Sequence, residues 1–206
     1  MTHRLDVPGL DVSRETIERL EAVEALVRKW TQRINLIAPA TVPDLWNRHI
    51  RDSAQLLPLA PSDFRIWADL GSGGGFPGLV IASHLLCNPS GPRVVLVESD
   101  QRKAAFLRSA IRELDLPAEV HVTRAESEPP LEADVVSARA LAPLTGLLGL
   151  ASRHLAPGGS AIFPKGRDHA AEITAARAHW HFDLVESRSI TDPEAAILRI
   201  ERMRRV

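Results

Sequence analysis

The stretch Ile66-Trp67-Ala68-Asp69-Leu70-Gly71-Ser72-Gly73-Gly74-Gly75-Phe76-Pro77-Gly78 decides the fold of this chain. A short apolar run meets an acid and then a dense group of glycines, which is typical of a buried strand that turns tightly into a helix. Glycines allow a ligand to approach bare backbone at the carboxyl edge of an open parallel sheet. The stretch therefore predicts a nucleotide-type binding site, and its neighbours must indicate the ligand.

Strand-like and helical runs alternate on either side of this stretch, in the order of a βαβ fold. We expect strands at 66–70, 94–98, 119–123, 133–138 and 160–164. We expect helices at 77–86, 101–114, 143–155 and 169–180. Two extended runs, 182–190 and 196–203, flank Thr191-Asp192-Pro193-Glu194 and predict a terminal hairpin. The fold class is thus α/β, with a mostly parallel sheet, helices on both faces and an antiparallel C-terminal strand.

The N-terminal part of the chain has the pattern of a helical cap. Apolar residues recur at three- and four-residue steps from Ser13 to about Ile34, which predicts an amphipathic helix with Ser13 as its N-cap. A second helical stretch is expected from about Val42 to Leu57, before two prolines. We therefore assign residues 1–61 to an N-terminal helical cap and residues 62–206 to the α/β domain, packed as one compact unit.

Composition limits the class of protein. The chain has 206 residues, of which 45% are hydrophobic and 25% charged, as in a globular domain. The N-terminus lacks the apolar core of a secretion signal and no apolar run could span a membrane, so we expect a cytoplasmic protein. The single cysteine, Cys87, excludes an internal disulfide, and the scattered histidines form no metal set. With a net charge of −1, any attraction for nucleic acid must come from a local patch.

Residues 73–78 match the dinucleotide pattern G-x-G-x-x-G, but their surroundings favour another ligand. Asp69 stands two residues before Gly71, where a carboxylate attracts an ammonium group and repels a pyrophosphate. Pro77, in the expected first helical turn, lacks an N–H that a phosphate would use. A cationic ligand without phosphates suits this loop better, and S-adenosylmethionine is such a ligand. A nucleotide-dependent oxidoreductase is the rival class that would use the same loop.

Two further acids fit the same cofactor. Glu98 ends the second strand, where its oxygens can accept hydrogen bonds from both ribose hydroxyls. Ala125 and Glu126 follow the third strand, where an adenine would meet a backbone N–H and a carboxylate. Each acid alone is equally explained as a helix cap or a solvated carboxylate. The ordered series Asp69, Glu98 and Glu126 at successive strand ends favours a methyltransferase.

Motifs spread over nearly the whole chain form one set. They are Lys29-Trp30, Asn35-Leu36, Arg48-His49-Ile50-Arg51-Asp52-Ser53, the stretch 69–78, Lys103 to Leu107, Arg124-Ala125-Glu126, Ser137-Ala138-Arg139-Ala140 and Lys165-Gly166. On these motifs the chain resembles the RsmG (GidB) methyltransferases of bacteria. That family transfers a methyl group to N7 of a guanine in the 16S ribosomal RNA of the small subunit. The blocks around His49 and Arg139 are more specific than the glycine loop, which many methyltransferases share.

The resemblance implies a Rossmann-like class I S-adenosylmethionine-dependent methyltransferase fold that acts on 16S ribosomal RNA or the small ribosomal subunit. We expect the protein to be a monomer. It implies cofactor contacts at Gly71, Gly73, Phe76, Glu98, Ala125 and Glu126. It places Arg139 at the active edge, and His49 and Asp52 where they cover the cofactor or orient RNA. The chain departs from the family at Phe163-Pro164 and in its arginine-rich ending, both of which concern the RNA-facing rim.

Methylation of guanine N7 needs no general base, because N7 carries a lone pair and no proton. The Asn/Asp-Pro-Pro-aromatic motif of amine methylation is absent after the fourth strand, where Ser137-Ala138-Arg139-Ala140 stands. Catalysis then comes from in-line positioning and local electrostatics. We expect Arg139 to bind O6 or a phosphate of the substrate, or the carboxylate of the cofactor. The alternative is a surface arginine paired with Asp134 or Glu132.

Simpler explanations stand beside the remaining candidates. His49 and Asp52 could form an exposed pair on a helix, with an ordinary ion pair between Arg48 and Asp52. Lys165 could bind a phosphate or belong to a solvated basic face, as could the C-terminal arginines. Two other functions also stay open, another S-adenosylmethionine-dependent RNA methyltransferase and a non-catalytic ribosome-binding module on the same fold.

Overall fold

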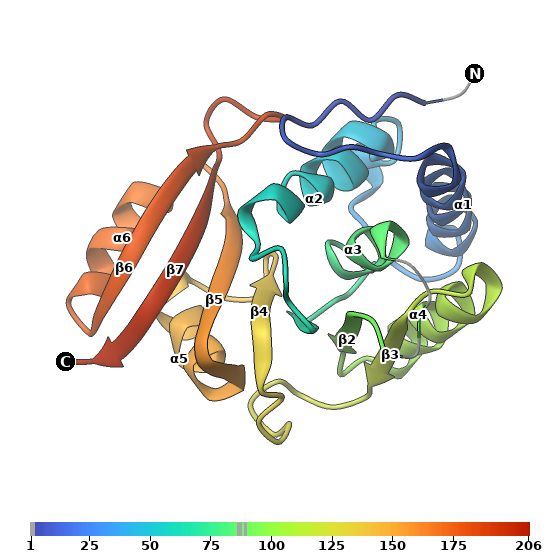
Figure 1. Cartoon of the computed structure of the whole chain (residues 1–206). Helices are drawn as coiled ribbons and strands as arrows, with labels where there is room; N and C mark the ends of the chain where they lie inside the picture. The colour runs from blue at the N-terminus through green and yellow to red at the C-terminus, as the bar shows by residue number, and fades with distance from the viewer. Residues whose placement is uncertain (1–2, 86–87, 89) are drawn as a thin grey trace.

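A computed structural model describes residues 3–85, 88 and 90–206 of the chain (Figure 1). In these residues, seven strands form one sheet in the order β3-β2-β1-β4-β5-β7-β6. The strands are β1 Ile66–Leu70, β2 Arg93–Val97, β3 Ala118–His121, β4 Ala133–Ala138, β5 Leu155–Lys165, β6 Trp180–Arg188 and β7 Ala196–Arg205. The first five are parallel, and β7 pairs antiparallel with both β5 and β6. This confirms the expected mostly parallel sheet with a C-terminal hairpin.

Helices cover both faces of the sheet, and their ends follow local sequence signals. They are α1 Arg14–Thr31, α3 Gly78–His84, α4 Gln101–Leu114, α5 Leu144–His154 and α6 His169–Arg177. Ser13 caps α1 by accepting from the Thr16 N–H, as expected. Pro77 is the residue before α3 and not its first residue. The expected end of that helix at Leu86, and Cys87, lie outside the described residues.

The expected helix 42–57 is wrong in detail. The segment is broken into η1 Pro39–Thr41, the π-helix η2 Trp46–Arg51, the short α2 Asp52–Ala54 and η3 Leu57–Leu59. Proline begins the first 3-10 turn and occupies the first turn of the last, which prevents one continuous helix. Single wide π turns are frequent at functional sites. Here the wide turn carries His49 and leads directly into Asp52.

Strand β5 begins at Leu155, five residues before the expected Ser160. Its pairing with β4 shifts register, so that Ala133 faces Leu155 while Val135 faces Ser160. The extra residues bulge out at Pro157-Gly158-Gly159, a sequence that predicts a turn by itself. The bulge explains why the sequence pattern places the start of the strand too late.

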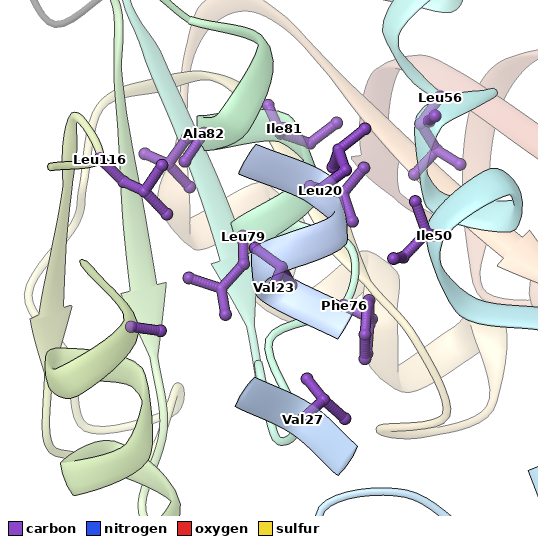
Figure 2. Close-up of a cluster of buried hydrophobic side chains, with 14 of the residues drawn as sticks. Leu20, Val23, Val27, Ile50, Leu56, Phe76, Leu79, Ile81, Ala82 and Leu116 are labelled. Carbon is purple, nitrogen blue, oxygen red and sulfur yellow. The ribbon is translucent and has the colours of Figure 1, made fainter. Parts of the chain in front are cut away.

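Two hydrophobic clusters lie on opposite faces of the sheet. In the first, Leu20, Val23 and Val27 of α1 pack against Leu79 and Ile81 of α3 (Figure 2). The N-terminal cap and the α/β domain therefore share a core. In the second cluster α5 and α6 cover the C-terminal part of the sheet (Figure 1). Within the described parts of the chain, no helix is long and apolar enough to cross a membrane.

Candidate functional site

The glycine loop is held by a chain of buried hydrogen bonds that starts at Asp69. This side chain is 0% exposed, and its carboxylate accepts from the Ser137 hydroxyl at 2.8 Å and the Gly78 N–H at 3.2 Å. The Trp67 indole N–H donates in turn to the Ser137 hydroxyl, at 2.8 Å. Burial raises the pKa of Asp69 to about 6, against the hydrogen bonds that lower it. Because this carboxylate is enclosed, the expected direct contact with an ammonium group is not offered in this conformation, and Asp69 secures the loop.

The loop turns through left-handed backbone and lies tightly against the N-terminal cap. Gly71 has φ +67°, and the N–H groups of Gly71 and Ser72 donate to the Val97 carbonyl at 2.8 and 3.0 Å. A Cβ added at Gly74 would lie 2.8 Å from the Leu36 carbonyl oxygen. Only glycine therefore allows the cap to approach the loop this closely.

Glu98 lies where a ribose would be bound, beside the glycine loop. Its side chain is buried, and its two oxygens accept from the N–H groups of Gly73 at 2.8 Å and Asp100 at 2.7 Å. Each carboxylate oxygen has a second lone pair. Glu98 can therefore hold the loop and accept from a ligand hydroxyl at the same time.

The expected cofactor residues lie along one edge of the sheet. Glu126 and Ala125 follow β3, Glu98 follows β2, and Gly71 follows β1, three strands that are adjacent in the sheet. Arg139 follows β4, the next strand in that order. Strand order reverses between β1 and β4, the place where open α/β sheets bind ligands. An extended ligand could thus cross three strand ends and reach Arg139.

Arg139 lies against residues of the N-terminal cap. Its Nη2 donates to His49 Nδ1 at 2.6 Å, and its Nη1 donates to the Arg48 carbonyl at 3.3 Å and lies 3.5 Å from Asp52 Oδ2. The Phe76 ring packs against the Arg139 guanidinium and the His49 imidazole. Its centroid lies 5.4 Å from the guanidinium carbon and 5.0 Å from the His49 ring centroid. Phe76, an expected cofactor contact, is buried beneath these two groups.

The alternative partners of Arg139, Asp134 and Glu132, do not hold it. Asp134 accepts from the backbone N–H groups of Arg65 and Ile66, at 2.7 and 2.9 Å, at the start of β1. Arg139 instead pairs with Asp52, with 22% of its side chain exposed. The interpretation of Arg139 as a surface arginine is therefore wrong.

His49 is a neutral partner that orients Arg139. Because a guanidinium only donates, His49 Nδ1 accepts, and its Nε2 carries the proton. That Nε2 donates to the Thr41 hydroxyl at 2.8 Å, which donates to the Ala38 carbonyl at 2.8 Å. Burial, with the charges of Arg139 and Arg48, lowers the pKa of His49 to about 3. This side chain is therefore uncharged near pH 7.

Asp52 joins the N-terminal cap to the turn between β6 and β7. Its Oδ1 accepts from the Thr191 hydroxyl at 2.6 Å and from the Gln55 amide at 2.9 Å. Gln55 Oε1 accepts from the Ile190 N–H at 2.9 Å. Sequence reasoning missed Gln55 and Thr191. Gln55 and Ile190 are separated by 135 residues, and Asp52 and Thr191 by 139 residues, so only the fold brings them together.

The interpretation of His49 and Asp52 as an exposed helical pair is also wrong. His49 is only 7% exposed, because the cap and Phe76 enclose it. Arg48 does not pair with Asp52 but with Asp192 of the β6–β7 turn, at 3.3 Å. The acid that pairs with Arg48 therefore comes from the β6–β7 turn, and not from the next turn of the same helix as the sequence pattern predicted.

A cleft of about 470 Å³ opens beside Arg139, between the cap and the β6–β7 turn. It is lined by Leu36, Ile37, Ala38, Thr41, Arg48, His49, Asp52, Gln55, Arg139, Ala140, Pro164, Lys165, Gly166, Glu172, Ser189, Thr191, Asp192, Ala195, Ala196 and Ile197. Lys165 ends β5 and pairs with Glu172 at 2.6 Å, with 10% of its side chain exposed. It belongs to no solvated basic face, and a phosphate would have to compete with Glu172.

Metal ligands do not gather in the part of the chain that the structure describes. No three His, Cys, Asp or Glu side chains there are close enough to hold an ion.

The sheet order, the antiparallel β7 and the ligand edge at β1 define the Rossmann-like fold of S-adenosylmethionine-dependent methyltransferases. A SAM-dependent methyltransferase from Aquifex aeolicus has this fold, with a TM-score of 0.59 over 86% of this chain and 96% of that chain, at 10% identity. Residues 16–200 match the rRNA small subunit methyltransferase G (GidB) family model, and the chain belongs to this family.

Two relatives support the assignment over nearly the full length. Ribosomal RNA small subunit methyltransferase G of Cereibacter sphaeroides is 53% identical over 197 residues, 96% of each chain. That of Ruegeria pomeroyi is 49% identical over 201 residues, 98% of each chain. The family resemblance found in the sequence motifs is thereby confirmed.

Proposed function

We propose that the protein transfers a methyl group from S-adenosylmethionine to N7 of a guanine in the 16S ribosomal RNA of the small subunit. Family membership supports the reaction class and the RNA. The observation that carries the N7 assignment is the Arg139–His49 bond, because it leaves His49 with no free acceptor nitrogen. This imidazole cannot serve as a general base, and N7 is a position that requires none.

The acids of the cleft are also engaged. Asp52 accepts from Thr191 and Gln55, Glu172 pairs with Lys165, and Asp192 pairs with Arg48. These contacts favour methylation of N7, which carries an available lone pair and no proton, over methylation of an exocyclic amine, which must lose a proton.

The residues at the strand ends would each bind a different part of the cofactor. We assign the adenine to Ala125 and Glu126, the ribose to Glu98, and the methionine end to the loop at Gly71 and Gly73. S-adenosylmethionine supplies the reactive methyl group on its sulfonium. The protein supplies position, because methyl transfer requires N7, carbon and sulfur in line.

Arg139 is the residue that we place closest to the chemistry. A guanidinium has five N–H groups, and three contacts are made here by its two terminal nitrogens. Donors therefore remain for the carboxylate of the cofactor or for O6 of guanine. N7 itself has to stay free, since a bond from Arg139 would block the reacting lone pair.

The experiment is methylation of small ribosomal subunits that lack the modification, with labelled S-adenosylmethionine. Label should enter 16S ribosomal RNA, and chemical cleavage specific for N7-methylguanine should map it to one guanine. Label at an amine or a ribose, or no label in RNA, would overturn the proposal. Calorimetric titration with NADH tests the oxidoreductase alternative, and we expect no binding. We further propose that the enzyme acts as a monomer in the cytoplasm, where small subunits are assembled.

The variant Arg139→Ala separates an enzyme from a ribosome-binding module. We expect its rate of methylation to fall by about a hundredfold or more, because a preorganised donor at the reacting groups is lost. Arg188→Ala, at an exposed arginine on β6, is the matched control and should keep the wild-type rate. Normal turnover by Arg139→Ala would remove Arg139 from the mechanism.

A further inference from the structure

The segment after β3 forms one helical turn that is anchored by the end of α5. The N–H groups of Ser127 and Glu128 donate to the Arg124 carbonyl, at 2.9 and 3.0 Å. Carbonyls at the end of such a turn have no partner within it. His154 and Arg153, the last two residues of α5, donate to these carbonyls and satisfy them.

The contacts fix the turn at two points. His154 Nε2 lies 2.8 Å from the Ala125 carbonyl oxygen, and since a carbonyl only accepts, Nε2 carries the proton. Arg153 donates to the Glu128 carbonyl through Nε at 3.0 Å and Nη2 at 2.9 Å. The Glu128 carboxylate also contacts His121 Nδ1, at 2.8 Å.

His154 is an unfavourable residue for its position unless this bond matters. The side chain is 0% exposed, and its Nδ1 is buried without a partner in the described structure. An unpaired buried polar atom costs stability, and an apolar ring would fill the same space without that cost. The bond to Ala125 is the only polar contact that the structure gives this side chain.

The geometry of the peptide bond links His154 to the cofactor. The peptide between Ala125 and Glu126 is planar and trans, so its C=O and N–H point in opposite directions. Because His154 holds the Ala125 carbonyl, the Glu126 N–H must point away from α5. We infer that His154 is a positioning residue that aims the Glu126 N–H at the adenine of S-adenosylmethionine, an inference that rests on the proposed cofactor.

The ligand chemistry at this turn is specific. Adenine presents an acceptor, N1, beside a donor, its N6 amine. The backbone N–H of Glu126 can donate to N1, and its side-chain carboxylate can accept from the N6 amine, so one residue offers the complementary pair. The carboxylate is exposed and free to turn, whereas the N–H is fixed by the peptide plane that His154 holds. His154 therefore sets the recognition of N1.

The test uses calorimetric titration of the full-length protein with S-adenosylhomocysteine, the product of the cofactor. His154→Phe should bind about tenfold more weakly, the value of one lost hydrogen bond. His154→Gln should recover most of the affinity, because its amide can donate to the same carbonyl. His84→Phe is the matched control, since His84 also bonds one helix carbonyl and leaves one nitrogen unpaired, and it should bind like wild type.

A second ligand separates positioning from a general loss of structure. The 1-deaza analogue of S-adenosylhomocysteine lacks the N1 acceptor. Wild type should bind it about tenfold more weakly than the parent compound, and His154→Phe should show little difference between the two. Equal discrimination by both proteins, or wild-type affinity in His154→Phe, would overturn the inference.

If His154→Phe does not fold, Arg153→Met provides a second test of whether the turn after β3 has to be anchored. Arg153 is exposed, so its loss frees only the Glu128 carbonyl. Binding should weaken about threefold, and unchanged binding would count against an anchored turn. Failure of wild type to bind S-adenosylhomocysteine would instead refute the proposed function, so the two failures are distinguishable.

Discussion

Burial shifts the pKa values of Asp69 and His49 in opposite directions. It raises the pKa of Asp69 to about 6 and, with the charges of Arg139 and Arg48, lowers that of His49 to about 3. Both shifts disfavour the charged form. Near pH 7 the Asp69 carboxyl is ionised and the His49 imidazole is neutral. Asp69 is then an anion near Arg139, and His49 can accept a hydrogen bond from it.

These shifts predict how stability depends on pH. Between about 3.8 and 6, folded Asp69 binds a proton that the unfolded chain has lost, so its contribution falls as pH rises. His49 acts in reverse between about 3 and 6.5, where the unfolded chain binds the extra proton. In Asp69→Asn the free energy of unfolding should therefore rise more steeply from pH 4 to 6 than in wild type. Urea denaturation at pH 4, 5 and 6 measures this.

His49→Gln is the complementary variant, and its free energy of unfolding should rise less with pH over the same range. Gln retains an amide that can accept from Arg139, so the change isolates the titration. Identical slopes in wild type and Asp69→Asn would mean that the Asp69 carboxylate is hydrated in the folded protein, contrary to its enclosure.

Among the elements, the glycine loop depends on its fit to the N-terminal cap. The Leu36 carbonyl leaves no room for a side chain at Gly74. We predict that Gly74→Ala separates the cap from the loop and weakens S-adenosylmethionine binding by about tenfold or more, as strain at a tightly packed backbone does. Calorimetry measures the affinity. Gly149→Ala, where an added Cβ would make only an ordinary contact 3.9 Å from Trp180, is the control and should bind normally.

The β6–β7 turn completes the site through Thr191. Its hydroxyl donates to Asp52, which faces Arg139. We predict that Thr191→Val slows methylation of small subunits about fivefold and destabilises the fold by about 1 kcal/mol, the loss of one part-buried hydrogen bond. Thr174→Val is the control, because that hydroxyl bonds a carbonyl of its own exposed helix. Unchanged rates for Thr191→Val would show that Asp52 holds its place through Gln55 alone.

The periodicity of apolar residues predicted the regular helices and strands. It failed for segments that contact residues far away in the sequence. The mostly parallel sheet and the terminal hairpin follow from apolar runs and turn residues. The π turn at Trp46–Arg51 does not follow from periodicity, and His49 within it contacts Arg139, 90 residues away. The bulge in β5 is likewise visible only in the pairing with β4, because Pro157-Gly158-Gly159 by itself predicts a turn and not a strand.

At the scale of the whole molecule, the cleft is assembled from three distant parts of the chain. The cap supplies His49 and Asp52, the segment after β4 supplies Arg139, and the hairpin supplies Thr191. Sequence motifs identified the first three by resemblance to a family. Thr191, Gln55 and His154 carry no motif, and only the folded chain gives their hydroxyl, amide and imidazole a partner.

The shared core also predicts that residues 62–206 do not fold alone. Leu20, Val23, Val27, Ile50 and Leu56 of the cap are each 0% exposed and pack on the sheet domain. Burying five such side chains contributes on the order of 10 kcal/mol, comparable to the whole stability of a typical domain, about 5–15 kcal/mol. The fragment 62–206 should therefore lack a cooperative transition in urea, while the full chain unfolds in one step.

Circular dichroism and proton chemical-shift dispersion of the fragment measure its folding. We expect little native sheet and no binding of S-adenosylmethionine, although Gly71, Glu98 and Glu126 are all present in it. The reason is that Gly74 then lacks the Leu36 carbonyl, and Arg139 lacks His49 and Asp52. A fragment that unfolds cooperatively and binds the cofactor would instead make the cap an added layer that serves the RNA alone.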